Sequence, residues 1–441
     1  MITDRRSPAI SHAFFYIGRF LIVALAACAA GLPKPGAAAE RGTLLPFSAS
    51  EIKRILEHGP WPVPWRGDPS NRVSGKPAAI AFGERLFFDS RLSAGGTVAC
   101  ATCHDPERNW TDGRKLAVGL EETDRNTPSV LNARLHRWFG WGGSGDSLWA
   151  QSIRPMLDGL EMGMTEKRVA DLIRNDREFA CRYRRAFGAP PSPADDDAVM
   201  VGAAKALAAF QETLVTGRTP FDEFRDALAR GDRKAAARYP QNAQRGLRIF
   251  VGKGLCSVCH FGPNFTNGEF DEIGIRHYTR ARGIDWGRYT GIKVMEASRF
   301  NLLGRYNDDA SRATAIFSRH VALDLRNYGQ FRVPGLRNVA LTAPYMHNGD
   351  LATLRDVVKH YSEIDPSRMH LGPDMLDSDG VATAIPIATI LKPLHLTERE
   401  IGDVVAFLES LTDTDSTKPR KPRAAGPACR PDPETAGDGK R

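Results

Sequence analysis

Two five-residue stretches decide the fold, CATCH at Cys100–His104 and CSVCH at Cys256–His260. In each stretch two cysteines, separated by two residues, are followed immediately by a histidine. Two thiols at this spacing can both add to the vinyl groups of one porphyrin, and the adjacent imidazole is then directed at the iron. A zinc site needs four ligands, whereas each stretch carries three of its own. The sequence therefore predicts two covalently attached c-type haems, with His104 and His260 as the proximal ligands of the two iron atoms.

Similar residues precede both stretches, which indicates a weak internal repeat. GERLF at Gly83–Phe87 comes before the first stretch, and GLRIF at Gly246–Phe250 comes before the second. In each case the pattern predicts an amphipathic helix, and a further helix begins after Thr397, which can form a capping box with Glu400. We therefore expect a mainly α-helical chain of two cytochrome c-like haem domains packed around a site between them.

Size and composition limit the class of protein. The chain has 441 residues, of which 42% are hydrophobic and 25% are charged, so it can bury more than one core. This composition excludes a disordered, collagen-like or disulfide-scaffold protein. The 60 Lys and Arg residues against 52 Asp and Glu residues give a net charge of +8. Because that excess is small and interspersed, it does not indicate a nucleic-acid partner.

The first 39 residues are typical of a secretory signal. A basic start leads into the apolar run Phe20–Ala30 and then into small residues at Ala37–Glu40, which predicts cleavage after Ala39. The apolar run is shorter than the ~20 residues that a membrane span requires, and no later run approaches that length. We expect the mature chain in the periplasm, an oxidising compartment. A lipid anchor on Cys28 is the alternative, because the residues before it resemble a lipoprotein signal.

The remaining sequence suggests five segments and one open cysteine question. Cys181 and Cys429 can pair as a disulfide or stay as buried thiols, and their spacing does not decide between the two. The C-terminal end has few large apolar groups, which predicts disorder. The expected organisation is a signal peptide over 1–39, an N-terminal extension over 40–76, an N-terminal cytochrome c domain with a helical connector over 77–235, a C-terminal cytochrome c domain over 236–417 and a disordered tail over 418–441.

Several further blocks resemble the bacterial dihaem cytochrome c peroxidases, and within them the MauG-type enzymes. The resemblance covers about residues 77–415. Besides the two haem stretches, it rests on blocks that occur in the same order at Asp124–Pro128, Trp141–Glu161, Val333–Asn338 and Thr342–Gly349. In this family the first haem, held by His104, reacts with peroxide, whereas the second haem, held by His260, passes or stores electrons.

The resemblance implies that the first haem is open to peroxide without prior reduction. Peroxidases of the group close its distal side with a histidine, but here no histidine lies between His104 and His136, and the distal position falls on Pro155. His136 is a possible substitute ligand, although a histidine flanked by arginine and next to a tryptophan is more often a surface or packing residue.

Further site residues are implied by the same resemblance. Glu161 and Gln151 match the distal acid and its polar partner, since a carboxyl group beside the iron could move a proton between the two peroxide oxygens. Taken alone, Glu161 would be a solvated surface residue. Trp141 matches an indole that carries charge between the haems, although by itself it would suggest core packing. A calcium site, for which hard oxygen donors are suited, is implied at Asn126, Thr342 and Pro344.

Tyr361 falls where cytochrome c peroxidases place a methionine ligand to the second haem and MauG-type enzymes place a tyrosine. Local sequence agrees, because a helix capped at Thr353 puts Leu354, Val358 and Tyr361 on one apolar face. An anionic tyrosine oxygen favours oxidised iron, which suits a haem that shares oxidising equivalents. The alternatives are a core tyrosine bonded to a carbonyl group, or ligation by His360, Met346, Met369 or Met375.

One position departs from the MauG pattern. MauG-type enzymes acting on methylamine dehydrogenase carry a tryptophan two residues before the first cysteine of the second stretch, where this chain has Gly254. The resemblance therefore does not supply the substrate. Trp286 or Trp110 could take over that role, and nothing in the sequence selects either.

Taken together, these features predict an exported dihaem oxidoreductase that uses hydrogen peroxide. The electron donor would be a c-type cytochrome or a cupredoxin. One alternative is MauG-type oxidation of a partner protein, as in the maturation of a methylamine-dehydrogenase-like cofactor. The other is a non-catalytic dihaem electron carrier, which would require both iron atoms to be six-coordinate.

Overall fold

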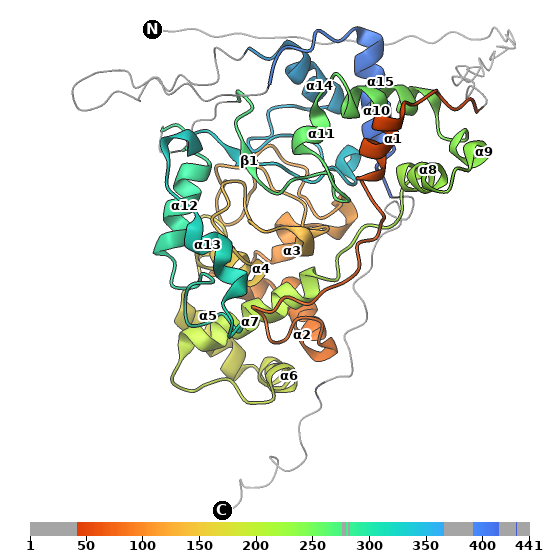
Figure 1. The fold of residues 1–441 in the computed structure, drawn as a ribbon. Helices are drawn as coiled ribbons and strands as arrows, with labels where there is room; N and C mark the ends of the chain where they lie inside the picture. The colour runs from red at the N-terminus through yellow and green to blue at the C-terminus, as the bar shows by residue number, and fades with distance from the viewer. Residues whose placement is uncertain (1–41, 276–278, 281–282, 366–390, 414–428, 430–441) are drawn as a thin grey trace, which may run out of the picture. The chain divides into compact units, whose positions relative to one another are not determined.

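Helices make up most of the regular structure in the computed structural model (Figure 1). The model describes residues 42–275, 279–280, 283–365, 391–413 and Cys429. In these residues the two short strands β1 (Phe270–Asp271) and β2 (Phe331–Arg332) pair antiparallel, with Phe270 opposite Arg332. The prediction of a mainly α-helical fold is therefore confirmed.

The helices follow one another along the chain with long irregular connections. Up to residue 230 the α-helices are α1 (Ala49–Leu56), α2 (Pro77–Phe87), α3 (Cys100–Cys103), α4 (Leu148–Leu157), α5 (Glu166–Asn175), α6 (Arg177–Phe187), α7 (Asp196–Gln211) and α8 (Pro220–Ala229). The later ones are α9 (Arg233–Ala236), α10 (Gln241–Val251), α11 (Cys256–Cys259), α12 (Arg288–Ala297), α13 (Ile316–His320), α14 (Leu354–Glu363) and α15 (Glu398–Glu409). Single turns of 3-10 helix are η1 (Ser90–Leu92), η2 (Pro106–Arg108), η3 (Ala133–Leu135), η4 (Ala313–Ala315), η5 (Leu325–Asn327) and η6 (Val339–Leu341).

A first hydrophobic core forms around α7, which α2, α4 and α5 contact. From Val199 to Gln211 every residue of α7 is buried, so this helix lies inside the core rather than on it. At the crossing of α2 and α7, a Cβ atom on Gly83 would lie 1.9 Å from the carbonyl oxygen of Ala206. The first glycine of the repeat is therefore required by close packing of two helices.

A second core forms where α10 packs against α15, with α1, α8 and α14 around them (Figure 1). A Cβ atom on Gly246 would lie 1.9 Å from the carbonyl oxygen of Asp403, so the second glycine of the repeat has the same role as the first. Asp403 also forms an ion pair with Arg245. The capping box of Thr397 and Glu400 is present at the start of α15, as predicted.

The division into two haem domains remains a prediction, although the two cores agree with its general form. Phe300, Leu302 and Ala315 lie in the segment assigned from sequence to the second domain, yet they pack into the first core. A buried ion pair between Arg337 and Asp222 fixes the loop before η6 to the start of α8.

Some predictions concern residues outside the described part of the chain. The signal peptide over 1–39, the lipid-anchor candidate Cys28, and all of the tail over 418–441 except Cys429 belong to this group. Cys429 forms a disulfide with Cys181, which settles the question that their spacing left open. Within the described residues, no helix is both long and apolar enough to cross a membrane.

Candidate functional site

The first haem stretch forms α3 and presents the histidine that follows it. The hydroxyl of Thr102 accepts a hydrogen bond of 3.0 Å from the Ala99 backbone N–H, which caps the short helix. His104 Nδ1 donates to the carbonyl oxygen of Trp110 at 3.2 Å, and Trp110 adopts a positive φ of 63°. Because Nδ1 holds the proton, Nε2 has a free lone pair for a metal ion.

The second haem stretch repeats this arrangement. Its two cysteines begin and end α11, and His260 Nδ1 donates to the carbonyl oxygen of Phe265 at 3.0 Å. Phe265 also has a positive φ, of 53°. Both predicted proximal ligands are therefore oriented by a backbone carbonyl in a left-handed turn five or six residues further on, an arrangement that fixes the imidazole tautomer.

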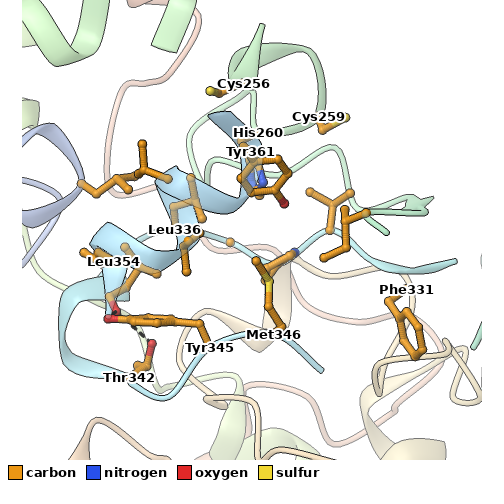
Figure 2. Close-up of a pocket in the computed structure, with 18 of the residues that line it drawn as sticks. Cys256, Cys259, His260, Phe331, Leu336, Thr342, Tyr345, Met346, Leu354 and Tyr361 are labelled. Carbon is orange, nitrogen blue, oxygen red and sulfur yellow. Dashed lines mark hydrogen bonds between the residues drawn. The ribbon is translucent and has the colours of Figure 1, made fainter. Parts of the chain in front are cut away.

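A cavity of about 270 Å³ lies beside the second haem stretch and brings several predicted residues together (Figure 2). Cys256, Cys259, His260 and Tyr361 all line it, and the figure shows the tyrosine ring beside His260. Tyr361 comes from α14, which the predicted capping box of Thr353 begins. Burial raises the pKa of Tyr361 above its ordinary value.

The structure also separates Tyr361 from some of its rivals. His360 Nε2 lies 2.7 Å from the carbonyl oxygen of Ile273, so this ring is engaged elsewhere. Met346 lines the same cavity as Tyr361 and is the remaining described rival (Figure 2). Met369 and Met375 lie outside the described residues.

A buried guanidinium in this cavity, on Arg332, was not anticipated from the sequence. Arg332 is 6% exposed, and its Nε donates to the carbonyl oxygen of Gly140 at 3.4 Å. Burial lowers the pKa of Arg332 to about 10, and in the described part of the chain no carboxylate forms an ion pair with it. A buried cation needs an anion, and the carboxylates of a haem would supply one. The residues present therefore fit this cofactor.

His136 lines the same cavity, which agrees with the packing role among the two roles, surface or packing, that its sequence neighbours suggested. Its Nδ1 is 3.3 Å from a terminal nitrogen of Arg332. Burial, followed by the charge of Arg332, lowers the pKa of His136 well below its ordinary value. Neutral His136 thus packs beside the Arg332 cation. No feature of the sequence pointed to this pair, apart from the position of Arg332 directly before the Val333–Asn338 block.

The predicted distal residues lie on and just after α4. Gln151 and Pro155 are four residues apart and share one face of this helix. Gln151 Oε1 is buried without a hydrogen-bond partner among the described residues. Burial raises the pKa of Glu161 to about 7, Asp158 adds to the rise, and Arg154 opposes it. Glu161 also acts electrostatically on Cys100 and Cys103, so it lies near the first haem stretch.

Trp141 lines the same cavity as Tyr361. Its indole Nε1 donates to the carbonyl oxygen of Asn126 at 2.8 Å, and its ring lines the cavity that holds Tyr361. The ring of His347 lies 6.5 Å from that of Trp141 and stacks on Phe331 at 3.5 Å between centroids. Trp141 is thus held by the Asn126 backbone while it lines the cavity that also holds Tyr361.

The predicted calcium residues Asn126, Thr342 and Pro344 also line this cavity. The side-chain N–H of Asn126 donates a hydrogen bond to the carbonyl oxygen of Arg114 at 2.8 Å. This bond uses the nitrogen of the amide group, so the amide oxygen remains able to coordinate a cation. In the described part of the chain, no group of three or more His, Cys, Asp or Glu side chains could hold a metal ion. The predicted donors are of a different kind, since they are amide, hydroxyl and carbonyl oxygens, which suit Ca²⁺.

Comparison with known proteins agrees with this geometry. The model of the di-haem cytochrome c peroxidase family matches residues 77–230. The methylamine utilization protein MauG of Methylorubrum extorquens is 34% identical over 76% of this chain and 78% of its own length. The cytochrome-c peroxidase IdrP1 of Denitromonas iodatirespirans is 31% identical over 81% of this chain and 85% of its own length.

Solved structures show the same fold. A MauG-like protein associated with microbial copper homeostasis is 25% identical, with a TM-score of 0.58, over 81% of this chain and 97% of its own. The diheme peroxidase BthA from Burkholderia thailandensis is 23% identical, with a TM-score of 0.57, over 83% of this chain and 94% of its own.

Fold and site thus define a dihaem c-type cytochrome. The chain belongs to the di-haem cytochrome c peroxidase family, in which MauG is also found, and the resemblance seen in the sequence is confirmed. It is a haem oxidoreductase that uses hydrogen peroxide and carries two haems.

The departure at Gly254 has a structural reason. A Cβ atom there would lie 2.8 Å from the carbonyl oxygen of Ile249, so a tryptophan would require the backbone to move. Of the two tryptophans considered as substitutes, Trp110 is 4% exposed and Trp286 is 43% exposed. Of these two, Trp286 is therefore the one that a partner can reach.

Proposed function

We propose that the two haem sites have different tasks, with peroxide reacting at the His104 site and oxidising equivalents shared with the His260 site. A bound c-type haem supplies an iron atom that binds peroxide and accepts oxidising equivalents from it. The observation that carries the proposal is Glu161, a half-buried carboxyl group whose pKa is raised to about 7 beside the first haem stretch.

In this proposal Glu161 moves the proton that peroxide cleavage requires. With a pKa near neutrality, the carboxylate can take a proton from one peroxide oxygen and return it to the leaving oxygen. Gln151 shares a face of α4 with Pro155. It offers a buried amide oxygen that can hold peroxide or a water molecule in place. Pro155 has no side-chain ligand to offer, so it would leave the distal position open.

The second site would hold oxidising equivalents rather than react with peroxide. Tyr361 from α14 and His260 after α11 would hold the iron of the second haem, and both line the same cavity. An anionic phenolate stabilises oxidised iron. Arg332, which lacks a carboxylate partner in the described residues, would pair with the haem carboxylates.

Trp141 would connect the two sites, and a calcium ion would hold it in position. Asn126 bonds the Trp141 indole through its backbone carbonyl group, while its amide oxygen would bind Ca²⁺ together with Thr342 and Pro344. The same residue thereby links the metal site and the indole.

We further propose that the chain is exported to the periplasm after cleavage behind Ala39 and receives electrons from a c-type cytochrome or a cupredoxin. MauG-type oxidation of a partner protein is the second candidate, favoured by the 34% identity to a MauG protein. Gly254 argues against the partner that methylamine-utilising MauG proteins oxidise, because no tryptophan occupies that position.

The rate of the peroxide reaction tests the proposal. We expect Glu161→Gln to slow the peroxide-induced change in haem absorption by at least ~100-fold, the effect of losing a general acid-base group. Glu121→Gln is the control, because Glu121 is exposed in a neighbouring loop. A wild-type protein that is inert to peroxide would point to the electron-carrier alternative, and an unaffected Glu161→Gln variant would remove Glu161 from the mechanism.

A further inference from the structure

A second tryptophan lies near Trp141, and it is exposed. Trp286 is 43% exposed and lies two residues before the start of α12. Among the large hydrophobic side chains that the described residues expose, the other tryptophan is Trp65 at 52%. Trp286 therefore differs from buried tryptophans such as Trp110, because a molecule in solution can touch its ring.

A close approach of glycine residues joins the neighbourhoods of Trp286 and Trp141. A Cβ atom on Gly142 would lie 2.6 Å from the carbonyl oxygen of Gly287, and one on Gly291 would lie 1.8 Å from the carbonyl oxygen of Gly142. The backbones at 142 and 287 are thus in direct contact. Trp141 directly precedes Gly142, and Trp286 directly precedes Gly287. The Cα atoms of the two tryptophans therefore lie within about 14 Å of each other.

Buried polar contacts make this junction rigid. Asp285 accepts two hydrogen bonds from Arg125, at 2.7 and 2.6 Å. Arg125 directly precedes Asn126, whose carbonyl oxygen accepts a hydrogen bond from the Trp141 indole. The Arg288 guanidinium donates to the carbonyl oxygen of Gly143 at 2.8 Å. Trp286 and Trp141 are therefore held at a fixed separation by contacts on both sides.

Trp286 also belongs to an aromatic cluster. Tyr289 and Tyr328 stack with a centroid distance of 4.1 Å and an interplanar angle of 14°. The indole of Trp286 meets both rings edge-on, at 5.9 and 5.2 Å. Packing of α12 on η5 accounts for the stacked pair, but it does not require an exposed indole. An electron-rich cluster that reaches the surface beside Trp141 suits one-electron transfer.

We propose that Trp286 is the surface residue through which an external one-electron donor delivers electrons to Trp141 and the two haem sites. This inference rests on the proposed role of Trp141 between the haems. One hydrogen peroxide molecule takes up two electrons and two protons and gives two water molecules. For each electron, the Trp286 indole first gives one electron to oxidised Trp141. The donor then returns one electron to the oxidised Trp286 ring, and no bond of the ring forms or breaks.

The test follows electron delivery separately from the peroxide reaction. Hexacyanoferrate(II) is the probe, because a small, highly charged anion stays outside the protein interior. One equivalent of peroxide is mixed with the protein, the absorption change of the haems is recorded, and the donor is then added. We expect Trp286→Phe to slow the donor-dependent step at least tenfold, and Trp65→Phe, the exposed-tryptophan control in the N-terminal extension, to leave it unchanged.

The competing entry point is the exposed apolar surface at the second haem stretch, formed by Leu255, Val258 and Phe261. An unchanged donor rate in Trp286→Phe would overturn the inference, and a slowed rate in Val258→Glu would then assign electron entry to this apolar surface. Failure of the wild type to react with peroxide would instead remove the proposed function.

A second measurement does not depend on the folding of a variant. In the wild-type protein treated with peroxide and a nitroso spin trap without donor, we expect mass spectrometry to find the adduct on the peptide that contains Trp286. An adduct confined to other peptides would contradict the proposal.

Discussion

At the scale of single residues, the environment of one carboxyl group, that of Glu161, sets its proton affinity. Burial, with help from Asp158, raises the pKa of Glu161 from 4.5 to about 7. The ionised carboxylate that accepts a proton from peroxide is therefore present above about pH 7 and is lost below it. The same burial makes the folded protein hold this proton between pH 4.5 and 7 while the unfolded chain has released it, so ionisation of Glu161 lowers stability as the pH rises through that window.

The pH dependence of the peroxide reaction should reveal this group. We expect the rate constant of the wild type to rise about tenfold per pH unit below pH 7 and to level off above it, as for a single ionisation. Glu161→Gln should lose this step. Glu212→Gln is a matched control. Burial also raises the pKa of Glu212 to about 7, but this carboxyl group accepts a hydrogen bond from Ser74 and belongs to neither haem stretch. A step that persists in Glu161→Gln would assign the ionisation to another group.

At the scale of helices, the repeat around the haem stretches is explained by packing. The sequence showed Gly83 and Gly246 at equivalent positions, but only the structure shows that each lies where a carbonyl group of a second helix approaches. The face of α14 was predictable as well, since Leu354 and Val358 are buried and Tyr361 lines the cavity. In contrast, Arg332 lies in the two-residue strand β2, and the segment over 300–315 is mostly irregular. Neither is long or regular enough to show a hydrophobic periodicity, so their neighbours could not be read from the sequence.

Substitution of the crossing glycines tests this packing. We expect Gly246→Ala to lower the free energy of unfolding by about 1–3 kcal/mol or more, since a methyl group would overlap the carbonyl oxygen of Asp403. Gly402→Ala, on α15, is the control: the nearest atom to its Cβ would be 3.7 Å away, on Arg355. There, alanine should add up to about 1 kcal/mol through helix propensity. Urea denaturation measures both, and equal stability of the two variants would refute the explanation.

At the scale of the whole molecule, the account requires the two haem sites to act together through Trp141. If calcium holds Asn126, its removal should loosen the indole that bonds the Asn126 carbonyl group. We expect treatment with EGTA to leave the peroxide reaction of the first site in place and to slow the response of the second site at least tenfold, with recovery on adding Ca²⁺ but not Mg²⁺. A full two-site response in protein shown by elemental analysis to lack calcium would contradict this role.

The central claim is that Tyr361, together with His260, would hold the iron of the second haem. It separates an enzyme that shares oxidising equivalents between two haems from a simple electron carrier, and the cavity holds both Tyr361 and its rival Met346. Tyr361→Phe removes only the hydroxyl group, and Met346→Leu is the matched variant for the rival. Both keep the approximate volume of the side chain, so the cavity should stay packed.

The most direct measurement is electron paramagnetic resonance of the oxidised protein before and after one equivalent of peroxide, for the wild type, Tyr361→Phe and Met346→Leu. We predict one high-spin and one low-spin ferric signal, which peroxide diminishes together in the wild type and in Met346→Leu but not in Tyr361→Phe. Two low-spin signals that do not respond to peroxide, or a joint response that survives in Tyr361→Phe, would contradict the account.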